Sequence, residues 1–169
     1  MEIEVKAKID NKDEIINKLK SLGFTFLRRE VQEDIYFNGI DRDFKETDEA
    51  LRVRDSNNTY FLTYKGPKLD NISKSREEIE VKIEDKDKMV KILEKLGFRR
   101  SLTVRKVREV YKFRDILACI DEVEGLGLFL ELEKEGNLED VEKLLNILKK
   151  LNLNNKIIRE SYLEMLMKG

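Results

Sequence analysis

The pentapeptide Glu-Ile-Glu-Val-Lys occurs twice, at residues 2–6 and 78–82, and each copy leads into an amphipathic stretch ending Leu-Gly-Phe. Successive side chains of a β-strand point to opposite faces of its sheet. Each copy therefore places two carboxylates and an ammonium on one face, and isoleucine and valine on the other. A sheet of such strands either exposes its charged face to solvent or encloses a polar cavity.

Three strand-plus-helix units can be aligned along the chain, which predicts an internal duplication within one domain. The units cover residues 2–24, 78–98 and 128–151, and each contains apolar residues at helical spacing. A final helix is predicted over residues 156–167. Three amphipathic helices need an apolar surface to cover, and the apolar strand faces can supply it.

Alternating segments between these units predict further strands, joined as hairpins. They lie at residues 31–37, 50–54, 60–65, 103–113 and 116–121. The pairs Asn57-Asn58 and Arg114-Asp115 are typical of tight turns, and residues 68–74 are predicted to form a loop. The expected fold class is α+β: an eight-stranded antiparallel closed β-barrel with helices packed outside and an internal pseudo-repeat.

The balance of charge limits the partners that this chain can have. Charged residues make up 41% of it, but 34 Lys and Arg against 35 Asp and Glu leave a formal net charge of −1. No basic coat is available, so neither a nucleic acid nor a membrane is expected as a partner. No leader or membrane-spanning run is visible, and a cytoplasmic protein is therefore expected.

The chain has no histidine and one cysteine, Cys119. This composition excludes histidine-dependent nucleophiles, imidazole-bound metals, multi-thiolate zinc sites and an intrachain disulfide. Any chemistry must use carboxylates, lysine, arginine, tyrosine and hard cations.

One face of the predicted strands collects charges of both signs. A single strand of this kind is explained equally well by a solvated face, but recurrence in at least five strands favours an inward orientation. The interior must then hold water, counter-ions and a charged ligand, because burying unpaired ions is prohibitive. The acidic set is Glu2, Glu4, Asp121, Glu131 and Glu133; the basic set is Lys6, Arg52, Arg54, Lys65, Lys106 and Arg108.

These two sets have complementary chemistry. Carboxylate oxygens suit Mg²⁺ or Mn²⁺, whereas arginine forks and lysine point charges suit a polyphosphate along its length. Hard cations beside anion-binding side chains, without histidine, indicate phosphoryl or nucleotidyl transfer by positioning and charge neutralisation.

The same strands resemble those of the CYTH family, the triphosphate tunnel metalloenzymes that unite class IV adenylate cyclases with thiamine triphosphatases. The resemblance covers nearly the whole chain, taken as one domain of residues 1–169. The motifs are Glu-Ile-Glu-Val-Lys at 2–6, Gln-Glu-Asp-Ile-Tyr-Phe at 32–37, Ala-Leu-Arg-Val-Arg at 50–54, Thr-Tyr-Lys-Gly-Pro at 63–67, Lys-Val-Arg at 106–108, and Asp121 followed by Glu-Leu-Glu at 131–133.

The resemblance implies an eight-stranded tunnel, dependence on Mg²⁺ or Mn²⁺, and a triphosphate substrate. It implies metal ligands at Glu2, Glu4, Asp121, Glu131 and Glu133. It implies phosphate contacts from Lys6, Arg52, Arg54, Lys65, Lys106 and Arg108, with Arg76 either joining them or lying on the surface. Among these, Glu2, Glu4, Lys6 and Glu131 are the implied catalytic residues.

Five other residues have expectations of their own. Glu78 and Glu80 are expected to form ion pairs with Lys82 or Arg54, and Tyr36 and Cys119 are expected in the wall or core. The tail around Tyr162 resembles the cyclase-like branch, in which the last helix closes one tunnel mouth.

Three functions remain open on the sequence. The first is a class IV adenylate cyclase, which forms cyclic AMP and pyrophosphate from ATP; the tail and the compact length favour it by resemblance. The second is a triphosphatase that hydrolyses tripolyphosphate, thiamine triphosphate or a nucleoside triphosphate. The third is a non-catalytic binder of polyphosphate or nucleotide, which the intact metal carboxylates disfavour. A homodimer is compatible with the resemblance.

Overall fold

The computed structural model describes residues 1–168 and is built around one antiparallel sheet. Its strands are β1 (Glu2–Lys8), β2 (Thr25–Asn38), β3 (Ala50–Ser56), β4 (Thr59–Lys65), β5 (Glu78–Ile83), β6 (Arg99–Phe113), β7 (Ile116–Val123), β8 (Gly127–Glu135) and β9 (Ile157–Ile158). They lie in the order β5-β4-β3-β2-β6-β7-β8-β1-β9, and every neighbouring pair is antiparallel. The predicted α+β class and the hairpin pairing are confirmed.

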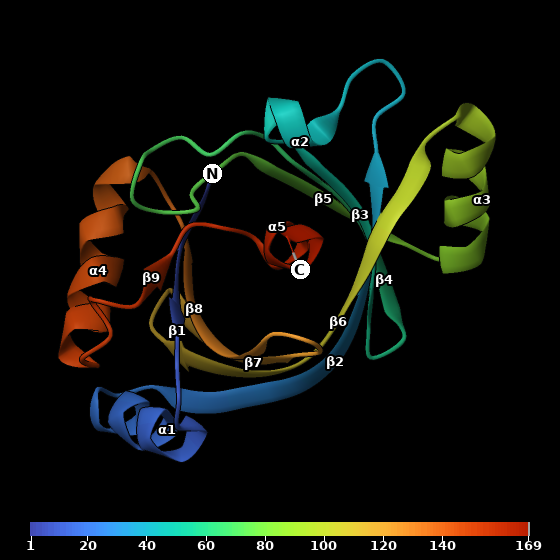
Figure 1. Ribbon diagram of the computed structural model, residues 1–169. Helices are drawn as coiled ribbons and strands as arrows, with labels where there is room; N and C mark the ends of the chain where they lie inside the picture. The colour runs from blue at the N-terminus through green and yellow to red at the C-terminus, as the bar shows by residue number, and fades with distance from the viewer. Residues whose placement is uncertain (169) are drawn as a thin grey trace.

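The sheet curves strongly around a central space (Figure 1), but its strands do not close into the expected eight-stranded barrel. β5 and β9 are the two edges of a nine-stranded sheet. The gap between β1 and β5 is bridged instead by residues 73–76, here called the closing segment. Glu2 and Arg76 exchange backbone hydrogen bonds of 3.2 Å, and the Lys74 amide donates to the Glu4 carbonyl at 2.9 Å. The closing segment, a short coil, thus takes the place of the strand-to-strand pairing that was expected to close the barrel.

Three amphipathic helices lie outside the curved sheet (Figure 1). They are α1 (Lys12–Ser21), α3 (Lys86–Leu96) and α4 (Val141–Lys150), the last preceded by the 3₁₀ turn η1 (Leu138–Asp140). Side chains of Asn11 and Asp85 accept hydrogen bonds from the first turns of α1 and α3, which satisfies amides that have no partner within a helix. Gly97 ends α3 with a φ of 107°, a conformation that favours glycine.

The main core lies between the outer face of the sheet and helices α1 and α4. Ile3 and Val5 of β1 are fully buried there, packed with Leu132 of β8, Leu19 of α1 and Leu144 of α4. Burying each such side chain contributes about 1.5–3 kcal/mol. Because alternate residues of a strand face opposite ways, this burial forces the charged residues of β1 onto the concave side.

The helical cover does not extend to β5. Val90 and Leu93 of α3 pack against Val53 of β3, whereas Ile79 and Val81 on the outer face of β5 are 56% and 53% exposed. The expectation that helices cover the apolar strand faces is therefore wrong for this edge strand.

The C-terminal region differs from the single helix predicted over residues 156–167. Ile157 and Ile158 form β9 by pairing with Ala7 and Lys6 of β1, and only α5 (Tyr162–Lys168) is helical. α5 lies inside the curve of the sheet, while the short α2 (Phe44–Thr47) lies on its rim (Figure 1). Within residues 1–168, the helices are too short and too polar for any of them to span a bilayer.

Candidate active site

The concave face of the sheet lines a cavity of about 770 Å³, a size typical of small-molecule sites. Many of the charged side chains inside it are withdrawn from solvent: Glu4 is 2% exposed, Lys106 4% and Arg52 6%. The inward orientation predicted for the charged strand faces is confirmed by this burial. The predicted site residues that line the cavity are Glu2, Glu4, Arg52, Arg54, Lys65, Arg76, Lys106, Arg108, Glu131 and Glu133.

Three of the five predicted metal ligands converge at one point. Glu4, Glu131 and Glu133 each offer a carboxylate oxygen, and these oxygens lie within 4.8 Å of one another. Glu4 and Glu133 are directly paired across β1 and β8, and Glu131 is two residues from Glu133, on the same face. Burial and the charge of Glu131 raise the pKa of Glu4 to about 7, and burial raises the pKa of Glu133 to about 8. A divalent cation would relieve this crowding, and an all-oxygen donor set fits Mg²⁺ or Mn²⁺.

The other two predicted metal ligands do not join this cluster. Glu2 Oε1 lies 3.5 Å from Lys65 Nζ. Asp121 is fully buried and accepts two hydrogen bonds of 2.7 Å from Arg108 and a third, also 2.7 Å, from the Tyr162 hydroxyl. With both oxygens used in this way, the geometry presents Asp121 as a support for Arg108.

A second buried carboxylate, Asp34, orders two of the predicted phosphate-binding cations. Arg54 donates to its two oxygens at 2.6 and 2.8 Å, and Lys106 donates at 2.9 Å. Burial acts to raise the pKa of Asp34, but Arg54 and Lys106 outweigh it and hold the pKa well below its ordinary value. Asp34 is not among the predicted site residues. It lies two residues after Gln32 on the same strand face, and this alternation could have placed it in the cavity.

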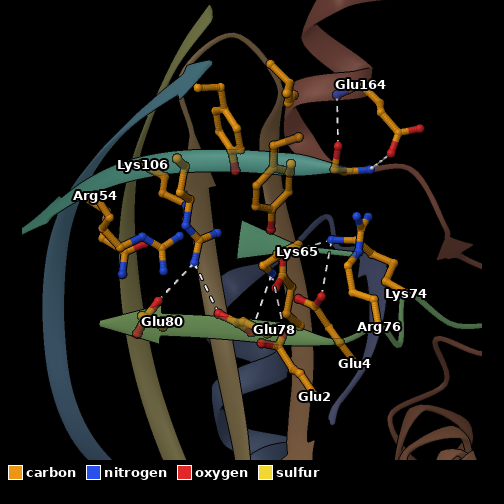
Figure 2. Close-up of a pocket in the computed structure, with 18 of the residues that line it drawn as sticks. Glu2, Glu4, Arg54, Lys65, Lys74, Arg76, Glu78, Glu80, Lys106 and Glu164 are labelled. Carbon is orange, nitrogen blue, oxygen red and sulfur yellow. Dashed lines mark hydrogen bonds and ion pairs between the residues drawn. The ribbon is translucent and has the colours of Figure 1, made fainter. Parts of the chain in front are cut away.

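Arg52 has the geometry that most favours an anionic ligand. Its guanidinium lies 3.6 Å from both Glu78 and Glu80. These two glutamates project from β5 into the cavity (Figure 2). Its buried Nε has no hydrogen-bond partner within residues 1–168, and such an unsatisfied donor is costly unless a ligand meets it. The ion pairs expected between these glutamates and Lys82 or Arg54 are wrong; their partners are Arg52 and, for Glu78, also Lys65 at 3.9 Å.

Three further residues of the site are buried: Arg76, Tyr36 and Cys119. Arg76 is buried and donates to the Gly66 carbonyl at 3.1 Å, so the surface alternative for it is wrong. Tyr36 and Cys119 are buried wall residues, as expected, and both also face the cavity. Burial acts to raise the pKa of Tyr36, but the charge of Arg52 outweighs it and lowers the pKa.

Lys6 is turned toward the C-terminal segment rather than the open cavity. Its Nζ donates to the Glu160 carbonyl at 2.6 Å and lies 3.8 Å from the centroid of the Tyr162 ring. Burial and the nearby charge of Lys74 lower the pKa of Lys6 well below its ordinary value. Tyr162 and Glu164 of α5 line the cavity; closure of a tunnel mouth by this last helix stays a prediction.

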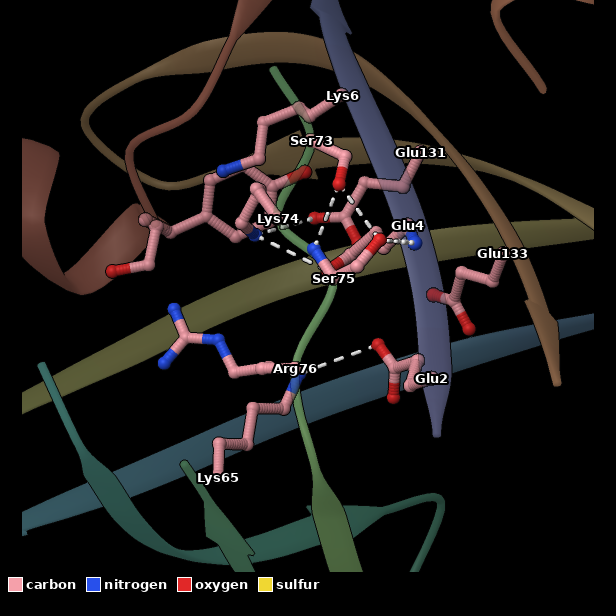
Figure 3. A network of polar contacts seen from close by, with 12 residues as sticks. Glu2, Glu4, Lys6, Lys65, Ser73, Lys74, Ser75, Arg76, Glu131 and Glu133 are labelled. Carbon is pink, nitrogen blue, oxygen red and sulfur yellow. Dashed lines mark hydrogen bonds and ion pairs between the residues drawn. The ribbon is translucent and has the colours of Figure 1, made fainter. Parts of the chain in front are cut away.

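Lys74 is the main site residue that the sequence does not predict. It lies in the expected loop, yet it is buried, with Nζ 3.4 Å from Glu4 Oε2 and 4.0 Å from Glu131 Oε1 (Figure 3). Burial opposes its charge, but Glu4 and Glu131 raise the pKa of Lys74 above its ordinary value. The sequence gives little indication of this position, because the residues before Lys74 do not alternate between polar and apolar as those of the predicted strands do.

Known proteins are similar to this chain in sequence and in fold. The family model described as the CYTH domain matches residues 1–163. "Putative adenylate cyclase MJ0240" of Methanocaldococcus jannaschii is 60% identical over 171 residues, which cover 98% of each chain. The PH1819 protein of Pyrococcus horikoshii has a structure with a TM-score of 0.90 at 45% identity, covering 99% of each chain.

A more distant structure has a described activity. It is a Hippeastrum protein, "Putative adenylyl cyclase HpAC1", said to reveal a dominant triphosphatase activity. Its TM-score is 0.63 at 25% identity, over 90% of this chain and 89% of its own. The family match over residues 1–163 and the 60% identity to the archaeal relative have one consequence: the chain belongs to the CYTH domain family.

Proposed function

We propose that this chain is a divalent-metal-dependent enzyme that binds a linear triphosphate in its cavity and converts ATP to cyclic AMP and pyrophosphate. One observation carries the proposal: a cluster of three carboxylates and a set of buried cations, among them Arg52 with its unsatisfied Nε, line the same cavity. A bound polyanion would meet the cations, and a hard cation would meet the carboxylates.

The cations would bind and orient the phosphates. Arg54 and Lys106 are held side by side by Asp34, and Arg108 is held by Asp121, so their donors are positioned before a ligand arrives. Such preorganisation reduces the entropy cost of binding. Mg²⁺ or Mn²⁺ held by the three-carboxylate cluster would stabilise charge that develops on phosphate oxygens.

The two candidate reactions differ in which phosphorus atom is attacked. In the cyclase reaction, the ribose 3′-oxygen bonds to the α-phosphorus, the bond to the α,β-bridging oxygen breaks, pyrophosphate leaves, and the hydroxyl proton is released to solvent. Support for this reaction comes from the M. jannaschii relative, whose name describes an adenylate cyclase and which covers 98% of this chain.

A triphosphatase is the second candidate, and the Hippeastrum protein favours it. That protein carries a cyclase name and a dominant triphosphatase activity, so the cyclase name alone does not fix the reaction of a relative. In the hydrolytic reaction, the oxygen of water bonds to the terminal phosphorus and the bond from that phosphorus to its bridging oxygen breaks. The remaining diphosphate group leaves, the water proton is released to solvent, and orthophosphate is the second product. The same cation set would hold the substrate, displaced along the cavity by the length of one or two phosphates.

Product analysis with three substrates separates these possibilities. The protein is incubated with ATP, thiamine triphosphate or tripolyphosphate in Mg²⁺ and in Mn²⁺, and products are resolved by anion-exchange chromatography. Cyclic AMP with pyrophosphate supports the cyclase, and orthophosphate supports the triphosphatase. Tight binding without either product would instead indicate a non-catalytic binder. Glu122→Gln, which alters an exposed carboxylate of β7, is the matched control for the cluster variant Glu131→Gln.

A further inference from the structure

A buried lysine lies among the carboxylates that are proposed to hold the metal. Lys74 Nζ lies 3.4 Å from Glu4 and 4.0 Å from Glu131, and only 7% of its side chain is exposed. Both glutamates belong to the three-carboxylate cluster. An ammonium at this position and a divalent cation would draw on the same oxygens.

The backbone that delivers this lysine is fixed on both sides (Figure 3). The Lys74 amide donates to the Glu4 carbonyl at 2.9 Å, and the Ser75 hydroxyl accepts from the Glu4 amide at 3.4 Å. Ser73 donates to the Ser75 hydroxyl at 2.7 Å, and its carbonyl accepts from Arg159 at 3.2 Å. With the main chain held in this way, the flexible Lys74 side chain is the part that can leave the cluster.

Charge balance explains why a lysine lies among the three carboxylates without metal and why it would leave them when a divalent cation binds. Three neighbouring buried carboxylates repel one another, and unpaired buried charge is costly. Among residues 1–168, the cations within 4.0 Å of the cluster are Lys74 and Arg108, and Arg108 lies 3.2 Å from Glu133 and 3.4 Å from Glu131. A divalent cation adds two more charges at the same place, and it would repel an ammonium only a few ångströms away.

We propose that Lys74 is a tethered competitor of the divalent cation. Its ammonium neutralises Glu4 and Glu131 while the metal is absent, and it leaves them when the metal binds. This inference rests on the proposed function, because it requires that the cluster takes a divalent ion. Lys74 also lines the cavity, so the displaced ammonium stays where the phosphates would bind. Metal and triphosphate therefore assist each other's binding, since the triphosphate supplies the anion that the displaced ammonium lacks.

The test measures two affinities separately in the Lys74→Met variant. Mn²⁺ binding is measured without triphosphate, by the electron paramagnetic resonance signal of free Mn²⁺. Tripolyphosphate binding is measured by calorimetry in EDTA, without metal. We expect Mn²⁺ affinity to rise at least about tenfold, because a competing charge within 4 Å is gone, and tripolyphosphate affinity to fall. A purely structural role would weaken both, so opposite signs identify the competitor.

Lys65→Met is the matched control, because it removes an ammonium of the same cavity that pairs with Glu2 and Glu78, outside the cluster. Its Mn²⁺ affinity should rise by less than about threefold, and Lys74→Arg, which keeps the charge, should bind Mn²⁺ as weakly as the wild type. A Lys74→Met protein that binds Mn²⁺ no tighter than Lys65→Met overturns the inference and leaves the proposed function intact. A wild type that binds no Mn²⁺ overturns both.

Folding of the variant is followed by circular dichroism in the same titration. If Lys74→Met is unfolded without metal, Mn²⁺ should restore the fold, because it replaces the missing positive charge among the carboxylates. Failure to fold at any Mn²⁺ concentration would overturn the inference.

Discussion

Asp34→Asn gives the sharpest test of how the cation wall of the cavity is held. The carboxylate of Asp34 is fully buried and accepts hydrogen bonds from Arg54 at 2.6 and 2.8 Å and from Lys106 at 2.9 Å. Asparagine is nearly isosteric, but it removes the negative charge that both cations share. The variant therefore leaves a guanidinium and an ammonium buried without their counter-ion.

The expected loss of stability is large. Removing one partner of a buried ion pair costs about 3–5 kcal/mol, and the loss of a carboxylate shared by two cations places this variant near the upper value. For a chain of this length, a loss of about 5 kcal/mol lowers the thermal midpoint by roughly 10–20 °C. The free energy of unfolding is measured by urea titration, with the thermal midpoint as a second reading.

The effect has a defined dependence on pH. The pKa of Asp34 is lowered in the folded state, so its contribution to stability is complete above the unfolded pKa and is lost as the pH falls through the folded pKa. The asparagine amide of the variant does not titrate. The stability difference between wild type and variant should therefore be constant near neutral pH and should shrink below about pH 4.

A triphosphate should offset part of the loss, because it offers anions to the same two cations. At a hundredfold excess over Kd, tripolyphosphate would return about 2.7 kcal/mol. Asp41→Asn is the matched control: Asp41 also pairs with an arginine, Arg42 at 3.0 Å, but 75% of its side chain is exposed, so little change is expected. Two results would refute the reasoning: a loss of unfolding free energy below about 1 kcal/mol for Asp34→Asn, or no stabilisation of this variant by added tripolyphosphate.

Four other variants test three separate parts of the site. Glu4→Gln and Glu131→Gln should each abolish metal-dependent turnover while circular dichroism still shows a folded chain, because each removes one of three crowded carboxylates; full activity in both would show the metal assignment to be wrong. Arg52→Lys should raise the Kd for tripolyphosphate in calorimetry, since an ammonium cannot replace a guanidinium fork, and an unaltered Kd would contradict a phosphate role. Tyr162→Phe removes the 2.7 Å hydrogen bond to Asp121 and should lower stability by about 1 kcal/mol in urea unfolding; an unchanged midpoint would show that this bond does not hold α5.

Strand parity could be predicted because it depends on neighbouring residues alone. Once Ile3 and Val5 are assigned to the core, Glu4 and Lys6 must face the other way, and they are 2% and 0% exposed on the concave side. The same reasoning places Arg52 and Glu131 in the cavity. The turn at Asn57-Asn58 was also predictable, since both residues adopt positive φ, which asparagine tolerates.

The closure of the sheet could not be predicted, because it depends on contacts between distant segments. Residues 73–76 do not alternate, yet the Ser75 side chain and the Lys74 amide bond to Glu4, 70 or more positions away. Ile157 and Ile158 have helical spacing with Tyr162, but the free edge of β1 recruits them as β9. In both cases tertiary pairing outweighs local preference.

The partners of the buried charges were beyond prediction for the same reason. The sequence places Arg54, Lys106 and Asp34 on inward faces of three strands, but not which carboxylate each cation meets. Only the register of β2 with β3 and β6 sets Asp34 directly opposite Arg54 and within reach of Lys106.

At the closing segment, the wall of the cavity is held by fewer backbone hydrogen bonds than elsewhere. From β5 round to β1, neighbouring strands are joined by ladders of six or more residue pairs, whereas β1 meets residues 73–76 through three backbone hydrogen bonds. Thermal breathing of the ring should therefore start at this seam, and its amides should exchange with deuterium sooner than those of the ladders. Brief openings of the wall are therefore expected to be confined to this line, with the strand ladders on either side left intact.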